Sequence, residues 1–254
     1  MLNRTNGSCL RSLLVGASLL MAACSSKTES GPVDFQLYMK ETEATIAAGK
    51  YSEALDRCLW FHEHSRTASG MGGVRLSFAL SDWKKLADLY PPAQEAMVKT
   101  RDDTMAKLET GGADAALFQD LAALNRTLNQ EQATIDDFLL LAKARPTDAE
   151  RFWQLSDDVI FAYKRYDIAR DYIGDVQREY AKLLDQRGML VNAGQKDAAG
   201  SARLTQYADD TFARKVLQLI GFAVATNNKD GAKKLADEAE TVVPDTRYAL
   251  ALGN

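Results

Sequence analysis

From Val33 onward, apolar residues recur at the spacing of about 3.6 residues that places them on one face of a helix. A clear example begins at Ile135 and continues through the four successive apolar residues Phe138 to Leu141. The alternation of apolar and polar residues that marks a strand is missing, as are Val-, Ile- and Thr-rich runs joined by tight hairpin turns. The pattern therefore predicts an all-α protein, with a helical domain at 34–245 and a short C-terminal tail at 246–254.

Turn residues divide this pattern into helical segments of roughly 10 to 20 residues each. Glycine, proline and asparagine supply most of the breaks, because they favour turns or stop a helix. The breaks stand at Gly49–Ser52, Ser69–Gly73, Pro91–Pro92, Thr110–Gly112, Pro146–Thr147, Asn192–Ser201 and Asn227–Gly231. About ten or eleven helices joined by short turns form either a solenoid of helix pairs or an irregular helical bundle.

Several fragments resemble the tetratricopeptide repeat, a pair of helices of about 34 residues with small and aromatic residues at fixed offsets. The first-helix pattern is matched by Trp83, Leu86, Ala87 and Tyr90. Parts of other units stand at Gly49, Tyr51, Ala54, Leu121, Ala122, Phe138, Pro146, Tyr166, Ala169, Ala232, Ala239 and Pro244. The resemblance covers 34–66, 118–185 and 213–245. It implies a helix-pair solenoid with a concave surface, and the irregular bundle remains the alternative. The segment 78–93 is also similar to uncharacterised bacterial proteins of this size, which implies no activity.

The first residues indicate a targeting signal and not part of the fold. Arg4 and Arg11 accompany an apolar run from Ser12 to Ala23, which is shorter than the roughly 20 apolar residues needed to span a bilayer. The run 20–24, Leu-Met-Ala-Ala-Cys, resembles the lipobox of bacterial lipoproteins, with Met where that family prefers Leu. This resemblance implies a lipoprotein signal peptide that is removed before the cysteine.

The lipobox resemblance further implies that Cys24 becomes the acylated N-terminus, anchored to a membrane by its acyl chains. Residues 24–33 then form a small polar tether. In similar lipoproteins an Asp after the cysteine favours the inner membrane, so Ser25 implies a location in the cell envelope, on the outer membrane facing the periplasm. An ordinary secretory signal at 1–23, cut after Ala23 to release a soluble protein, is the alternative.

Composition and charge exclude several classes of protein. The formal net charge is −4, whereas a nucleic-acid binder is generally basic, so no nucleic-acid partner is expected. With 2 His and 3 Cys, a Cys/His-rich metal fold is not expected either. Cys9 leaves with the signal and Cys24 is acylated, so Cys58 remains alone and forms no intramolecular disulfide. No cofactor is predicted.

The segment 60–64, Trp-Phe-His-Glu-His, holds both histidines of the chain. A helix points residues two apart in different directions, whereas helical metal ligands are spaced three or four apart. Cys58 and His62 share a helical face and could form half a metal site, with a packed core edge as the alternative. The stretch 226–237 has a weak likeness to a calcium-binding loop, and a helix-to-helix turn explains the same residues.

No sequence pattern for catalysis stands out. A phosphate-binding loop and a Gly-x-Ser-x-Gly elbow are both missing. Adjacent acids on a helix usually form a solvated face or an N-terminal turn. Such pairs stand at Asp102–Asp103, Asp136–Asp137, Asp157–Asp158 and Asp209–Asp210. The sequence therefore nominates no catalytic residue and no complete set of metal ligands.

These observations predict a lipid-anchored, non-enzymatic interaction module or scaffold that holds an unidentified envelope protein or peptide. Five aromatic residues are candidates for the binding surface, and core packing is the alternative for each. They are Trp60, Tyr90, Trp153, Tyr163 and Tyr166. The alternative function is a cell-wall-associated enzyme, or an accessory factor that binds glycan or lipid.

Overall fold

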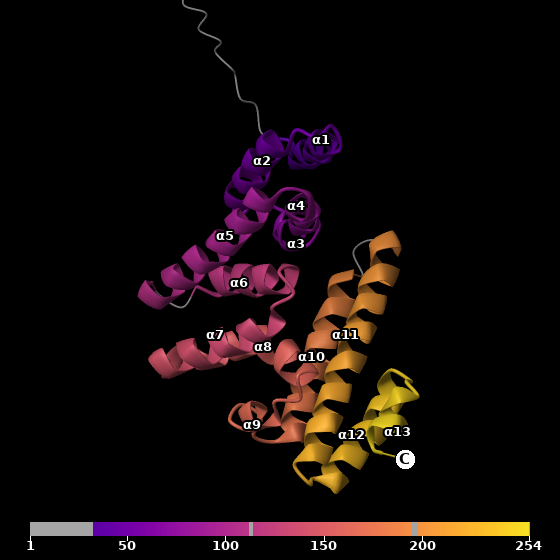
Figure 1. Ribbon diagram of the computed structural model, residues 1–254. Helices are drawn as coiled ribbons and strands as arrows, with labels where there is room; N and C mark the ends of the chain where they lie inside the picture. The colour runs from indigo at the N-terminus through magenta and orange to yellow at the C-terminus, as the bar shows by residue number, and fades with distance from the viewer. Residues whose placement is uncertain (1–32, 112–113, 195–197, 254) are drawn as a thin grey trace, which may run out of the picture. The chain divides into compact units, whose positions relative to one another are not determined.

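The computed structural model describes residues 33–111, 114–194 and 198–253, and Figure 1 shows its helices. The predicted signal peptide at 1–23, Cys24 and all of the predicted tether except Val33 lie outside the described residues. Within the described ranges the chain forms helices and no strand, so the all-α prediction is confirmed. The helices are α1 Phe35–Ala47, α2 Tyr51–His64, α3 Gly72–Leu76, α4 Phe78–Leu89, α5 Pro91–Thr110, α6 Ala115–Thr127, α7 Glu131–Ala144, the 3-10 helix η1 Pro146–Asp148, α8 Ala149–Ala162, α9 Tyr166–Ala169, α10 Val176–Gly194, α11 Ala198–Ala225, α12 Lys229–Val242 and α13 Arg247–Ala251.

Local chemistry sets most of the helix boundaries. Gly49 follows α1 with a φ of 73°, a left-handed conformation that glycine adopts without the strain of a Cβ. Pro91 and Pro92 open α5, where the missing proline N–H costs no helical hydrogen bond. The side chain of Asn228 accepts a hydrogen bond of 3.0 Å from the Gly231 N–H and caps α12. Breaks at these three places therefore follow from the residues themselves.

The break predicted at 192–201 is the main difference from the sequence pattern. Helix α10 continues to Gly194 and α11 begins at Ala198, so much of this polar stretch is helical. Ala193, Ala198 and Ala199 are among the residues that extend the two helices, and alanine is the best helix former. The two long helices pack against each other as a hairpin. None of the helices in the described ranges has both the length and the apolar character required to cross a membrane.

Helices that follow each other in the chain are neighbours, and so are several that stand two apart. Helix α4 contacts α6, α6 contacts α8, and α5 contacts α7. Helices α4, α6 and α8 therefore form one layer and α5 and α7 another, as in stacked helix pairs (Figure 1). The stacking is irregular beyond α8, because α9 is a single turn of 4 residues and the long α10–α11 hairpin follows it.

Two clusters of buried apolar residues hold the helices together. One joins α2, α4, α5 and α6 and contains Trp83 and Leu86 of the repeat-like pattern. The indole N–H of Trp83 donates to the Ala93 carbonyl oxygen at 3.1 Å, so this buried polar group has a partner. The second cluster runs from α5 to α13 and includes Ala232 and Ala239. These small side chains let α12 pack closely against α11.

The segment predicted as a C-terminal tail, 246–254, contains helix α13. Tyr248 in this helix is 1% exposed and belongs to the second core cluster. Helix α13 contacts both α11 and α12, so this segment packs on the helical unit.

Candidate functional site

Three hollows in the described part of the chain neighbour one another, each sharing one lining residue with the next. The first lies between α8, α10 and α11, has a volume of about 360 Å³ and is lined by residues that include Trp153 and Gln218. The second, of about 320 Å³, lies among α6, α7 and α8 and shares Leu155 with the first. The third, of about 520 Å³, runs along α4 and α6 and shares Arg126 with the second. We name these three neighbouring hollows together the α4–α11 groove.

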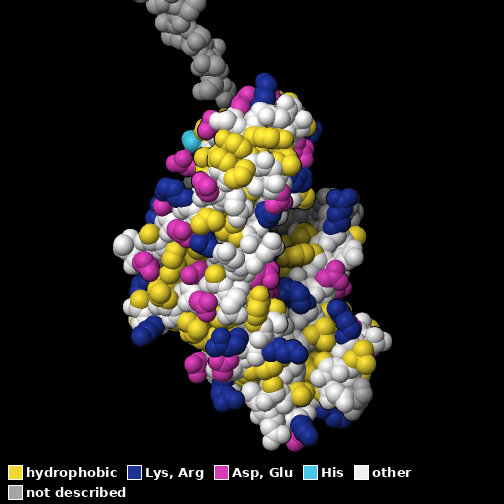
Figure 2. Space-filling view, viewed as in Figure 1, with side chains coloured by type: hydrophobic (Ala, Val, Ile, Leu, Met, Phe, Trp, Pro, Cys, Tyr) yellow, Lys and Arg dark blue, Asp and Glu magenta, His cyan; other side chains and the backbone are white. Residues whose placement is uncertain are grey.

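The α4–α11 groove carries charges of both signs. At its α8–α11 end, Lys182 pairs with Glu179 at 2.8 Å and Lys215 pairs with Asp157 at 2.5 Å. At its α4–α6 end, Arg126 donates to a backbone carbonyl oxygen of α3 at 3.0 Å and forms no ion pair with a described residue. Figure 2 shows basic, acidic and hydrophobic side chains interspersed on one face of the molecule. Arg126 shares the second hollow with the carboxylates of Glu131 and Asp158.

Asp157 and Asp158 connect α8 to α11 where the first two hollows meet. Lys215 lies 3.0 Å from Asp158, Gln218 Nε2 donates to Asp158 at 2.9 Å, and Arg214 pairs with the same carboxylate. Burial raises the pKa of Asp157 in spite of the nearby Lys215. Burial also acts to raise the pKa of Asp158, but Lys215 and the Gln218 amide outweigh it and lower that pKa. This acidic pair therefore forms an ion-pair cluster between helices, in which the Asp158 side chain is 52% exposed and the Asp157 side chain 19%.

In the side-chain amide of Gln218 the nitrogen forms a hydrogen bond and the oxygen forms none within the described residues. Its Nε2 donates to Asp158, and this bond to a carboxylate identifies which end of the amide is nitrogen. Its Oε1 is buried and has no hydrogen-bond partner among the described residues. A buried acceptor without a donor costs about 1–3 kcal/mol.

Of the five aromatic residues predicted to line a binding surface, Trp153 is the one that lines the α4–α11 groove. Its side chain is 7% exposed, and its ring stacks on Tyr172 with the centroids 4.8 Å apart. Tyr166 packs edge-on against Phe161 and Phe222. Phe161 also contacts Trp153, so these two predicted residues share a neighbour.

The other three predicted residues lie apart from the groove. Trp60 on α2 stacks on the His64 ring with the centroids 4.3 Å apart. Tyr90 follows α4, with its ring centroid 6.0 Å from that of Tyr51. Tyr163 follows α8 and is 44% exposed. The five predicted residues therefore do not make up a single surface.

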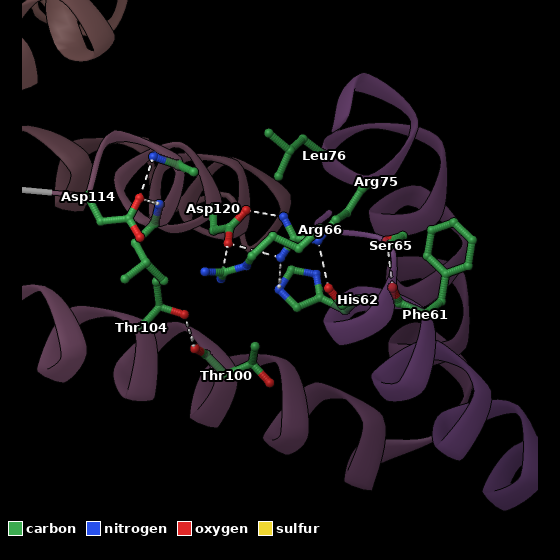
Figure 3. A network of polar contacts seen from close by, with 12 residues as sticks. Phe61, His62, Ser65, Arg66, Arg75, Leu76, Thr100, Thr104, Asp114 and Asp120 are labelled. Carbon is green, nitrogen blue, oxygen red and sulfur yellow. Dashed lines mark hydrogen bonds and ion pairs between the residues drawn. The ribbon is translucent and has the colours of Figure 1, made fainter. Parts of the chain in front are cut away.

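Asp120 on α6 is held between two arginines, as Figure 3 shows. Arg75 Nη2 donates to Asp120 at 2.9 Å, and Arg75 Nε donates to the His62 backbone carbonyl oxygen at 2.6 Å. Arg66, which follows α2, pairs with the same carboxylate. The side chains of Asp120 and Arg75 are 2% and 3% exposed. This buried network joins the ends of α2 and α3 to α6, with two guanidinium groups on one carboxylate.

Burial sets the protonation of the two titratable groups beside this network. Burial, followed by the charge of Arg75, lowers the pKa of His62 to about 4, so the imidazole is neutral at pH 7. Burial, followed by the charge of Asp82, raises the pKa of Cys58 to about 12. The thiolate is the nucleophilic form of cysteine, and this residue holds its proton at neutral pH.

Cys58 and His62, the pair considered as half a metal site, both line a cavity of about 20 Å³. Arg75 Nη2 lies 3.2 Å from His62 Nε2, so a guanidinium stands where a metal ion on this nitrogen would have to be. Among the described residues, no group of three or more His, Cys, Asp and Glu side chains is arranged to hold a metal ion.

Sequence reasoning did not identify Asp120 or Gln218. Asp120 stands 54 and 45 residues from its two arginines, and Gln218 stands 60 residues from Asp158. Helical periodicity relates only residues within about one turn of each other. No local signal in the sequence could have pointed to either group.

Cys24, the predicted lipid-attachment residue, lies outside the described residues. Comparison of the chain with models of known protein families, with curated proteins and with solved structures found no match. The geometry of the α4–α11 groove is therefore the observation on which a function can be proposed.

Proposed function

We propose that the protein is a lipid-anchored, non-enzymatic interaction module of the cell envelope that holds a segment of a partner protein in the α4–α11 groove. The observation that carries this proposal is the neighbourhood of the three hollows, the first and second of which share Leu155 and the second and third Arg126. A small-molecule site is usually a single enclosed cavity, whereas a surface that crosses several helices suits an elongated partner.

The proposed anchor rests on the N-terminal sequence. The basic start, the short apolar run and the lipobox-like residues 20–24 favour acylation of Cys24. One acyl chain gives only marginal membrane binding, so stable attachment requires the several chains that a mature lipoprotein carries. The polar residues from Ser25 onward would then tether the helical unit to the outer membrane on its periplasmic side.

The anchor is tested by labelling growing cells with a palmitate analogue. The wild-type chain is expected to be labelled, and the Cys24→Ala variant is expected to lose the label, because its thiol is gone. Cys58→Ala is the matched control and should be labelled like the wild type, because Cys58 is buried. Equal labelling of the Cys24→Ala variant would refute the assignment.

The partner is tested in intact cells with a photo-crosslinking amino acid placed at exposed positions. Gln154 and Asn129 line the groove, whereas Glu95 on α5 and Glu63 on α2 are exposed outside it. We expect a discrete protein adduct from the two groove positions and none from the two control positions. Equal adducts at all four positions, or none under any growth condition, would contradict the proposal. Turnover of cell-wall material by the purified chain would instead support the alternative, a cell-wall-associated enzyme.

A further inference from the structure

We infer that one end of the helical unit, formed by the start of α1, the end of α2 and the start of α4, rests on the headgroup region of the membrane and inserts Trp60 and its apolar neighbours there. This inference rests on the proposed lipid anchor and specifies which face of the protein the anchor brings to the bilayer. The place where the described helices begin, the side chains that gather there and their exposure lead to it.

The predicted tether is short, and the helical unit begins where it ends. Residues 24–33 span at most about 35 Å when fully extended, so the first turn of α1 stays within that distance of the acylated cysteine. Such a tether gives this end of the unit a high effective concentration at the bilayer, and a weak contact is then sufficient. The bilayer is therefore favoured as the occupant over a partner protein, which has to diffuse to the same surface.

Three helix ends lie together at this place. Helix α1 contacts α2, and the ring centroid of Phe35 is 5.6 Å from that of Phe61 in the last turn of α2. Ala79 in the first turn of α4 lines the same small cavity as Phe61. The start of α1, the end of α2 and the start of α4 therefore form one end of the unit, which we name the α1–α2–α4 end.

Aromatic rings are concentrated at the α1–α2–α4 end. The ring of Trp60 stacks on Phe35 with the centroids 6.2 Å apart, and its centroid is 4.7 Å from that of Tyr38. All three of these residues are partly exposed. Tryptophan and tyrosine are enriched where a membrane meets water, because their rings are apolar at one end and polar at the other. This cluster therefore has the composition of an interfacial contact.

Two apolar side chains at the same end are largely exposed. Leu37 on α1 is 53% exposed, and Phe78, the first residue of α4, is 67% exposed. A single exposed apolar residue is ordinary, but these two stand at the same end as the aromatic cluster. Transfer of such side chains from water to the headgroup boundary is favourable, since it removes apolar surface from water.

The charges at the α1–α2–α4 end have both signs. Lys40 and Glu63 are exposed, and Arg57 pairs with Glu41 at 2.8 Å. A mixed set of charges gains little from the negative surface of an anionic membrane. We therefore expect attachment through apolar contact, so that neutral phosphatidylcholine vesicles are a sufficient probe.

The inference is tested with the mature chain 24–254, which contains all of the described residues. Its Cys24 thiol is coupled to a maleimide-bearing lipid in phosphatidylcholine vesicles, whereas Cys58 is buried and keeps its proton. The acyl chains carry bromine near the headgroups, which quenches a tryptophan that it contacts. Trp83 and Trp153 are 1% and 7% exposed, so we expect Trp60 alone to be quenched and its emission to shift to the blue.

Variants at exposed positions test the contact without disturbing the core. The double variant Leu37→Ser, Phe78→Ser should shift the docked-to-free ratio by about tenfold or more toward the free state, so that the quenching is lost. Leu89→Ser is the matched control, because Leu89 is 57% exposed at the other end of α4, and it should be quenched like the wild type. The Trp60→Phe chain should show no quenching, because its remaining tryptophans are buried.

The inference is overturned if the wild-type chain is not quenched, or if the double variant is quenched as strongly, since proximity through the tether would then account for the signal. Association of two coupled chains through Trp60, without quenching by the lipid, would overturn it as well. Chemical coupling supplies the anchor in these vesicles. A failure here therefore leaves the palmitate labelling and the groove crosslinking standing, whereas a loss of labelling in cells removes the anchor itself.

Discussion

Replacing Asp120 with alanine is expected to lower the free energy of unfolding by about 3 to 5 kcal/mol, because removal of one partner leaves a buried charge uncompensated. The Arg75 side chain is 3% exposed, and its guanidinium loses a bond of 2.9 Å to the carboxylate. Arg66 loses the same partner. Chemical denaturation followed by far-UV circular dichroism would measure the change.

Asp103→Ala is the matched control for this prediction. Asp103 lies on α5 and pairs with Lys99 at 2.6 Å, but both side chains are exposed. An exposed ion pair contributes at most about 1 kcal/mol, so this variant should unfold almost like the wild type. The double variant Asp120→Leu, Arg75→Met should recover part of the loss, because it removes both buried charges. Equal stability of the Asp120→Ala and Asp103→Ala variants would show that the network does not stabilise the fold.

Acid is expected to destabilise the protein through His62 by about 3 kcal/mol as the pH falls from 6.5 to about 4. The pKa of His62 is lowered from 6.5 to about 4 by burial and then by Arg75. Between these two values the unfolded chain binds a proton at this residue and the folded chain does not. The stabilisation is therefore complete above pH 6.5, falls as the pH falls, and is lost below about pH 4.

The pH dependence is measured by denaturation at a series of pH values in the wild type and in His62→Gln. The variant has no imidazole at this position, so the difference between the two curves isolates the contribution of His62 from that of the carboxylates. His64→Gln is the matched control, because it makes the same substitution at an exposed position two residues away. Parallel curves for the wild type and His62→Gln would contradict the prediction.

The buried network and the α4–α11 groove meet on helix α6. Asp120 is on the buried side of this helix, whereas Arg126, less than two turns further on, is exposed in the groove. The network ties α6 to the ends of α2 and α3, and α3 supplies the carbonyl oxygen that Arg126 contacts. The position of Arg126 in the groove therefore depends on contacts formed by another side of the same helix.

The sequence by itself determined the helical content and many of the helix ends. These depend on interactions within a few residues, as with the apolar spacing from Ile135 to Leu141, the left-handed Gly49 or the two prolines that open α5. The sequence also indicated Trp83 and Leu86 as positions of the repeat-like pattern, and both side chains are buried. Local patterns could not tell which of the five aromatic residues line a binding surface, because a helical stripe of large side chains is typical of a core and of a binding surface alike.

Only the tertiary structure decided which groups meet. The two arginines of Asp120 come from 45 and 54 residues away, and the Asp157–Asp158 pair finds its partners 56 to 60 residues further along, on α11. The groove likewise consists of side chains from α3, α4, α6, α7, α8, α10 and α11, and no single segment of the sequence contains it. Helix formation is governed by hydrogen bonds four residues apart, whereas ion pairs and hollows are governed by how whole helices stack.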